Sequence, residues 1–187
     1  MFSNTKIILV IFLICAISSL QIHGPTIYNL GASPTYAEIS CNVEVIILGF
    51  SGAIDLYKNT GSRHQLRESL SGTATWSNRD SYAVSLPANP IVLSKADRVE
   101  VYEDSGSQFL LLQNISTASS VTSVTISEDE SYLLIGFSGK VEIYEWSTSY
   151  HKIQDLTHST DKIDASSMSN DNNYLAYGSD DLNMYIL

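Results

Sequence analysis

The sequence of 187 residues predicts an all-β fold built from repeated antiparallel sheets, and three observations support this prediction. Residues 47–57 and 134–144 share the letters GFSG, followed in both by alternating apolar and polar residues that end on tyrosine. The same strand ending recurs at intervals of 45, 42 and 41 residues, at Tyr57, Tyr102, Tyr144 and Tyr185. Alternation with a period of two indicates half-buried strands, and no sustained period of 3.6 residues indicates a helix after residue 24.

A turn rich in Ser, Asn and Asp is expected before the second strand of each repeat. Residues 127–133 match residues 169–175 at this point, and the segments 77–83 and 39–42 are placed there in the second and first repeats. The second repeat carries about eight extra residues, including Pro87 and Pro90. Because proline cannot donate a ladder hydrogen bond, we interpret this segment as a loop between the middle strands of that repeat.

Within the third repeat, the alternation predicts four strands, near residues 121–126, 131–137, 140–146 and 150–157. Repeats of about 40–45 residues with four antiparallel strands each are typical of β-propeller blades. Blades packed side by side bury both faces of each sheet. We therefore expect residues 35–187 to form four degenerate blades, the last of them incomplete because it stops after its third strand.

Residues 121–129, with Gly136 and residues 141–145 after them, resemble the WD-repeat pattern, which runs from a V-x-x-V-x-F-S-x-D turn to a strand ending in Trp-Asp. Residues 175–181, LAYGSDD, are similar to it as well. The resemblance covers about residues 35–187 and implies a propeller that serves as a binding scaffold. The chain departs from the family pattern because Tyr replaces Trp in all four repeats and the Gly-His dipeptide is missing. Only Asp180 or Asp181 can supply the family's turn aspartate. The hydrogen-bond network that links these groups in the family is therefore expected to be largely missing from this chain.

The N-terminal segment 25–34 contains a short apolar strand, residues 26–30, without an assigned partner. In propellers that this chain resembles, such a segment supplies the outer strand of the last blade, and we expect the same role here. Three arrangements remain open. The chain forms a four-bladed ring, or two chains form an eight-bladed ring as a homodimer, or the chain is a fragment of a larger propeller.

Residues 1–24 are predicted to be a signal peptide that directs the chain to the secretory pathway, as a secreted or membrane-anchored protein. An apolar run of fourteen residues, 7–20, follows Lys6. Such a run is too short to span a hydrocarbon core of about 30 Å comfortably, but it suits a signal peptide. An uncleaved anchor and a misassigned start codon are the alternatives. Membrane contact is expected only through this segment, and its cleavage would leave Cys41 as the single cysteine.

The composition and motifs favour binding over catalysis. A net charge of −10 disfavours nucleic acid as a partner. The sequence has no phosphate-binding loop, no Cys-x-x-Cys pair and no G-x-S-x-G motif, and we interpret both GFSG segments as turns. His151 and His158, seven residues apart on one predicted strand, would point to opposite faces. The acidic turns around Asp129, Asp171 and Asp181 are interpreted as solvated. No catalytic, cofactor-binding or metal-binding residue is therefore predicted.

Trp146 lies just past its repeat's tyrosine and near Tyr150, and we predict these two residues as contacts for a partner. Asn114 begins an Asn-x-Ser sequon and is a candidate glycosylation site. The leading hypothesis is a non-enzymatic protein-interaction scaffold whose protein partner is unidentified. The alternative is a secreted carbohydrate- or ligand-binding module that uses its aromatic residues and acidic turns. A third hypothesis is an enzyme whose site is completed by further sequence.

Overall fold

A computed structural model gives the fold of residues 36–40, 44–50, 53–71, 82–84, 90–95 and 97–187. These described residues form fifteen β-strands and no helix, which confirms the all-β prediction for them. It follows that none of them belongs to a helix of the length and apolar character needed to cross a bilayer. The predicted signal peptide and the segment 25–34 lie outside the described residues, as does Cys41.

The strands form four small antiparallel sheets, one for each repeat, and within each sheet neighbouring strands follow the order of the chain. Sheet 1 contains β1 (Tyr36–Ile39), β2 (Val45–Phe50), β3 (Ala53–Asn59) and β4 (His64–Ser71). Sheet 2 contains β5 (Tyr82–Val84), β6 (Ile91–Lys95), β7 (Arg98–Asp104) and β8 (Phe109–Ser116). Sheet 3 contains β9 (Ser123–Ile126), β10 (Tyr132–Gly136), β11 (Val141–Trp146) and β12 (Tyr150–Leu156). Sheet 4 contains β13 (Ile163–Met168), β14 (Leu175–Ser179) and β15 (Met184–Ile186).

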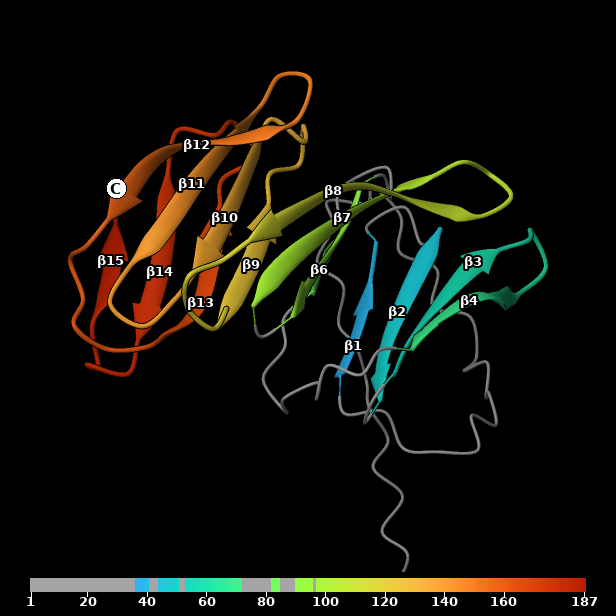
Figure 1. Cartoon of the computed structure of the whole chain (residues 1–187), viewed down its shortest axis with the longest axis horizontal. Helices are drawn as coiled ribbons and strands as arrows, with labels where there is room; N and C mark the ends of the chain where they lie inside the picture. Colours follow the sequence, from blue (N-terminus) through green and yellow to red (C-terminus); the bar gives the residue numbers. More distant parts are fainter. Residues whose placement is uncertain (1–35, 41–43, 51–52, 72–81, 85–89, 96) are drawn as a thin grey trace, which may run out of the picture.

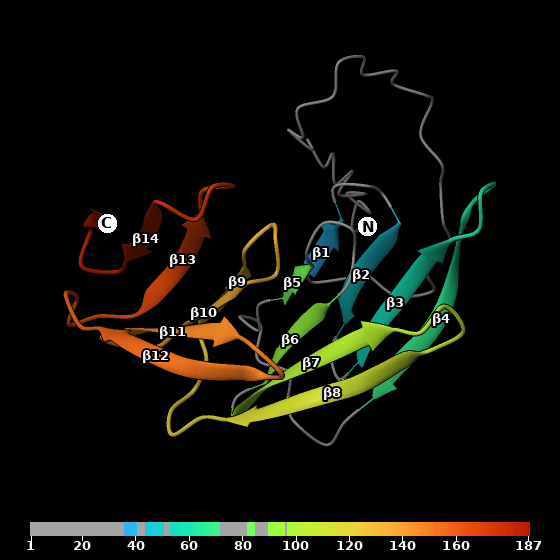
Figure 2. The ribbon, with the colours of Figure 1, turned by 90° about the horizontal axis from the view of Figure 1, so that it is seen from above.

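The four sheets stand face to face in chain order, like the leaves of a fan (Figures 1 and 2). The first strands of successive sheets lie against one another, because β5 contacts both β1 and β9, and β9 contacts β13. The last strands β4, β8 and β12 lie at the outer rim (Figure 2). The fan is open on one side, between sheets 4 and 1, so the structure shows no closed ring.

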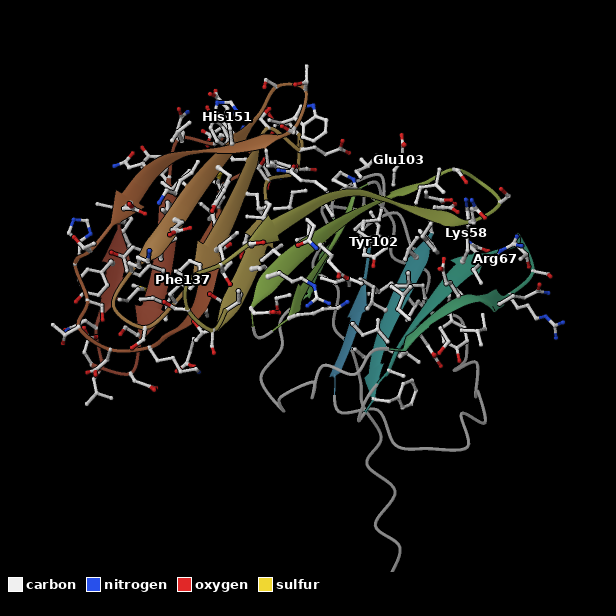
Figure 3. The ribbon with its side chains drawn as sticks, in the orientation of Figure 1. Lys58, Arg67, Tyr102, Glu103, Phe137 and His151 are labelled. Carbon is white, nitrogen blue, oxygen red and sulfur yellow. The ribbon has the colours of Figure 1, made fainter. Side chains whose placement is uncertain are left out.

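Three hydrophobic clusters fill the spaces between successive sheets. The cluster between sheets 1 and 2 contains Val45, Ile47, Ile54, Leu56, Ile91, Leu93, Tyr102 and Phe109. The cluster between sheets 2 and 3 contains Val92, Val99, Val101, Ile115, Val121, Val124, Leu133, Ile135, Phe137, Tyr144 and Tyr150. The cluster between sheets 3 and 4 contains Leu134, Val141, Leu156, Ile163, Leu175 and Tyr177. Tyr102 and Phe137 belong to this buried set, whereas His151 on β12 points away from it (Figure 3). In sheets 2 and 3, consecutive residues of the middle strands thus face opposite clusters, as the period-two pattern predicts.

The third repeat follows the sequence prediction closely, since each of its four observed strands starts and ends within two residues of the predicted bounds. The second GFSG segment forms the turn between β10 and β11, as predicted, and Gly139 there has a φ of 82°. The fourth repeat contains three strands among the described residues, also as predicted.

The predicted turn at residues 77–83 of the second repeat is wrong, because Tyr82 belongs to the first strand of sheet 2 and pairs with Leu93. The second strand begins at Ile91, so the proline-containing segment connects the first and second strands instead of interrupting the middle pair. Second strands then begin at residues 45, 91, 132 and 175, at nearly even intervals. The apparent insertion therefore came from aligning the wrong serine-rich segment.

The predicted equivalence of the four tyrosines holds for three of them. Tyr57, Tyr102 and Tyr144 stand opposite Ile46, Ile91 and Leu133, each at the start of a middle hairpin. Tyr185 instead stands opposite Tyr177, two residues nearer the turn, and Leu187 pairs with Leu175. The turn between β14 and β15 is one residue longer than its counterpart in sheet 3. Tyr185 also follows Leu175 by one residue less than Tyr144 follows Leu133, and the two differences together shift Tyr185 by two positions.

Candidate functional site

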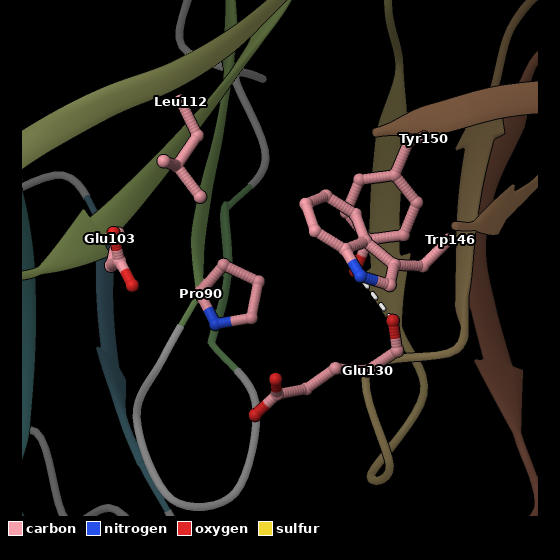
Figure 4. A pocket seen from close by; sticks show the side chains of 6 residues that line it. All are labelled: Pro90, Glu103, Leu112, Glu130, Trp146 and Tyr150. Carbon is pink, nitrogen blue, oxygen red and sulfur yellow. Dashed lines mark hydrogen bonds between the residues drawn. The ribbon is translucent and has the colours of Figure 1, made fainter. Parts of the chain in front are cut away.

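A small hollow of about 130 Å³ lies between the outer parts of sheets 2 and 3 (Figure 4). It brings together the two residues predicted as partner contacts and four residues that the sequence did not single out for this site. Its lining consists of Pro90, Glu103, Leu112, Glu130, Trp146 and Tyr150. The hollow thus combines aromatic, aliphatic and acidic side chains.

Trp146 and Tyr150 are neighbours because they close the hairpin between β11 and β12, where they stand directly opposite each other. Their ring centroids are 5.0 Å apart and the ring planes meet at 64°, an edge-to-face contact that aromatic pairs favour. Trp146 is 39% exposed, whereas Tyr150 is only 3% exposed. Trp146 therefore offers contact surface, and Tyr150 mainly holds it in place.

Tyr150 is fixed by hydrogen bonds to both sides of the hollow. Its hydroxyl donates to the backbone oxygen of Glu130 at 2.8 Å (Figure 4). Its backbone N–H donates to the side-chain oxygen of Gln113 at 2.8 Å, and the amide nitrogen of Gln113 donates back to the Tyr150 carbonyl at 2.8 Å. This pair of hydrogen bonds ties β8 to β12 and sets the separation of the two walls. Burial, with a smaller contribution from the charge of Glu130, raises the pKa of Tyr150, so its hydroxyl stays a neutral donor.

Two carboxylates and a leucine complete the hollow. Glu103 comes from β7, and Glu130 comes from the turn before β10, where its backbone has a φ of 65°. Both carboxylate side chains reach the neighbourhood of Pro90 and are partly buried (Figure 4). Leu112 on the outer strand β8 is 47% exposed. An exposed indole, an aliphatic surface and two carboxylates suit a cationic side chain with an apolar stem, such as Lys or Arg.

The turn that carries Glu130 is stabilised by its neighbour Asp129. The carboxylate of Asp129 accepts hydrogen bonds from the Ser127 hydroxyl, from Ser131 and from the amide of Asn172 in sheet 4. Burial alone would raise the pKa of Asp129, but these hydrogen bonds outweigh it and lower the pKa to about 2. The acidic turn is therefore a hydrogen-bonded structural element. Asp171 is held in the same way by Ser169 in sheet 4.

The histidines do not share a strand, which corrects the sequence prediction. His151 lies on β12 and is exposed, but β12 ends at Leu156, so His158 belongs to the following loop. There its Nδ1 lies 2.7 Å from the hydroxyl of Tyr177. Within the described ranges, no group of three or more His, Cys, Asp or Glu side chains could hold a metal ion. Asn114 is exposed on β8, and its glycosylation remains a prediction.

A hydrogen-bond network does join the loop residues of the fourth repeat, where the resemblance led us to expect little of one. The hydroxyl of Tyr185 donates to Asp181 at 2.8 Å, and Ser159 donates to the same carboxylate at 3.0 Å. The rings of Tyr177 and Tyr185 stack with centroids 4.9 Å apart. The network forms because a tyrosine hydroxyl reaches the carboxylate of a turn aspartate.

No protein-family model matches the sequence, and no curated protein matches it.

Proposed function

We propose that the chain is a non-enzymatic protein-interaction scaffold of the WD-repeat-like propeller type, which holds a cationic side chain of its partner in the hollow beside Trp146. The exposed indole of Trp146 near two carboxylates, Glu103 and Glu130, carries the proposal. The face-to-face stacking of four antiparallel sheets, three of them four-stranded, supports the propeller interpretation. Entry into the secretory pathway remains a prediction, since residues 1–24 lie outside the described residues.

The chemistry of the hollow favours Arg or Lys over other side chains. A cation near the face of a tryptophan is stabilised by about 0.5–2 kcal/mol, depending on how far it is desolvated. The aliphatic stem of the same side chain can lie against Leu112, while Glu103 and Glu130 neutralise its charge. The net charge of −10 adds a long-range attraction for basic partners.

Trp146→Ala is expected to weaken the binding of a basic peptide about tenfold, because the variant removes the cation–π contact and the apolar wall. Peptides for this test are selected from a phage-displayed heptapeptide library and measured by isothermal titration calorimetry. The double variant Glu103→Gln/Glu130→Gln should lose at least as much affinity and also lose most of the salt dependence.

Two matched variants serve as controls for this experiment. Leu66→Ala removes a side chain that is 50% exposed on the outer strand of sheet 1, away from the hollow. Glu128→Gln removes a charge from the same turn as Glu130 without altering the lining. Selected peptides without Lys or Arg, or unchanged affinity in Trp146→Ala, would contradict the proposal. Glycan-array binding that disappears in Trp146→Ala would support the carbohydrate-binding alternative instead.

A further inference from the structure

At its two ends, the fan has sheet faces that no other described sheet covers, and these faces repeat the chemistry of the internal interfaces. We call the side of a sheet that faces the preceding sheet its front face, and the side that faces the following sheet its back face. Sheet 1 has no preceding sheet and sheet 4 has no following sheet in the described structure. Among the described residues, no further sheet therefore covers the front face of sheet 1 or the back face of sheet 4.

The front face of sheet 1 matches the buried front face of sheet 3, position by position. The strand registers align Ile46, Leu48, Phe50 and Tyr57 with Leu133, Ile135, Phe137 and Tyr144. In sheet 3 these four side chains are only 0%, 0%, 2% and 8% exposed, because sheet 2 covers them. Their counterparts in sheet 1 are partly exposed. The open face thus has the composition of a face that another sheet covers.

The back face of sheet 4 corresponds to the back face of sheet 3 in the same way. Gly178 pairs with Met184, and Ala176 pairs with Ile186, as Gly136 pairs with Val141 and Leu134 with Ile143. Val141 is fully buried and Ile143 is partly buried, but their counterparts Met184 and Ile186 are 70% and 63% exposed. Large apolar side chains this exposed on one face are typical of an interaction surface.

We infer that the back face of sheet 4 packs against the front face of sheet 1 in a second copy of the chain, so that two copies close one ring. A second copy provides the required partner face, because its sheets have the same strand registers as the sheets that form the internal interfaces. Each copy contributes one front face of sheet 1 and one back face of sheet 4. A two-fold axis therefore creates two identical contacts and covers both faces of each copy. This inference is independent of the hollow beside Trp146.

The internal interfaces identify residues that meet across the proposed contact. Thr125 on the back face of sheet 3 lies with its hydroxyl 2.8 Å from the hydroxyl of Ser166 on the front face of sheet 4. The registers align Thr125 with Ser167, and Ser166 with Ala37. Ser167 of one copy should therefore lie beside Ala37 of the other.

The first test measures mass by sedimentation equilibrium and size-exclusion chromatography with light scattering. The purified chain is expected to have twice the chain mass, and Gly178→Glu should weaken self-association by about 100-fold or more, because it places a carboxylate in an apolar contact. No atom lies within 4 Å of a Cβ added at Gly178, so the variant leaves each subunit folded, which far-UV circular dichroism checks. Leu110→Glu, an equally drastic change at a side chain that is 41% exposed on the outer strand β8, should leave the dimer intact.

The second test uses cysteine cross-linking in a chain with Cys15→Ser and Cys41→Ser. A mixture of Ala37→Cys and Ser167→Cys chains should form a disulfide-linked dimer under mild oxidation, whereas neither variant alone should do so. A monomer, a ladder of higher species, or a dimer without the mixed cross-link would each overturn the two-chain ring. A monomer would favour coverage of the open faces by another segment or by a different protein.

Discussion

Gly136→Val is expected to lower the free energy of unfolding by about 3 kcal/mol, because the new side chain overfills the space between sheets 3 and 4. A Cβ at Gly136 would lie 2.1 Å from the hydroxyl oxygen of Ser123 and 3.2 Å from Cγ2 of Ile163. Ser123 can rotate away, but Ile163 is fully buried within the cluster between the two sheets. The branched valine side chain therefore has to push β13 away from β10. Urea denaturation followed by circular dichroism measures the loss.

Gly178→Val is the matched control, since Gly178 stands at the same point of the hairpin in sheet 4 and no atom lies within 4 Å of an added Cβ. The free energy of unfolding of the subunit should change by less than about 0.5 kcal/mol or rise slightly, because valine restricts the unfolded chain more than glycine does. The comparison is made at protein concentrations where the subunits are dissociated. Equal losses in both variants would show that the packing of sheet 4 against sheet 3 differs from the structure.

The repeated sheets could be predicted from the sequence because the middle strands alternate apolar and polar residues or are buried on both faces, and each turn has a characteristic composition. The third repeat shows this best, since its strands 132–136 and 141–146 alternate between two clusters. The second repeat could not be aligned correctly, because the segments 77–83 and 85–90 compete for the same turn and only the pairing of Tyr82 with Leu93 decides between them. The shift of Tyr185 depends in part on one additional turn residue, which the spacing of the tyrosines does not reveal.

The candidate site was predictable only in part, because its walls come from different repeats. Trp146 stood out as an aromatic residue outside the repeated pattern, and its exposure agrees with a contact role. Glu103 and Leu112 look like ordinary strand residues in the sequence, and they reach the hollow only because sheet 2 packs against sheet 3. The hydrogen bonds between Gln113 and Tyr150 join residues 37 positions apart, and no local pattern predicts them.

Two buried glutamate–tyrosine pairs, on β7 and β11, appear in the sequence only as part of the shared strand ending. In β7 and in β11 a glutamate stands two residues before the tyrosine, and in both strands the tyrosine hydroxyl donates to that glutamate at 2.8 Å. Glu100 also contacts Lys95 at 2.6 Å and Arg98 at 2.9 Å. Glu142 contacts Lys140 at 2.6 Å. Both carboxylates are largely buried, with side chains 7% and 10% exposed.

These contacts make the stability of the protein depend on pH. Burial alone would raise the pKa of Glu142, but hydrogen bonds from Lys140 and Tyr144 outweigh it, so the pKa falls below its usual 4.5. The pKa of Glu100 is lowered in the same way, since hydrogen bonds from Lys95 and Arg98 outweigh the effect of burial. A carboxyl whose pKa is lower in the folded state stabilises the fold fully above its unfolded pKa. That contribution is lost as the pH falls from about 4.5 through the folded pKa.

The double variant Glu100→Gln/Glu142→Gln is expected to lose about 3–4 kcal/mol of stability at pH 7. Each glutamine oxygen can still accept the tyrosine hydroxyl, but the lost charge weakens the contacts with Lys and Arg by roughly 1.5–2 kcal/mol at each site. Its stability should also fall less steeply than that of the wild type below pH 4.5. Urea denaturation at a series of pH values from 7 to 3 measures both effects. Glu145→Gln, which alters a side chain 45% exposed on β11, is the control and should change stability by less than about 0.5 kcal/mol. Parallel pH profiles for the double variant and the wild type would mean that other carboxylates govern acid unfolding.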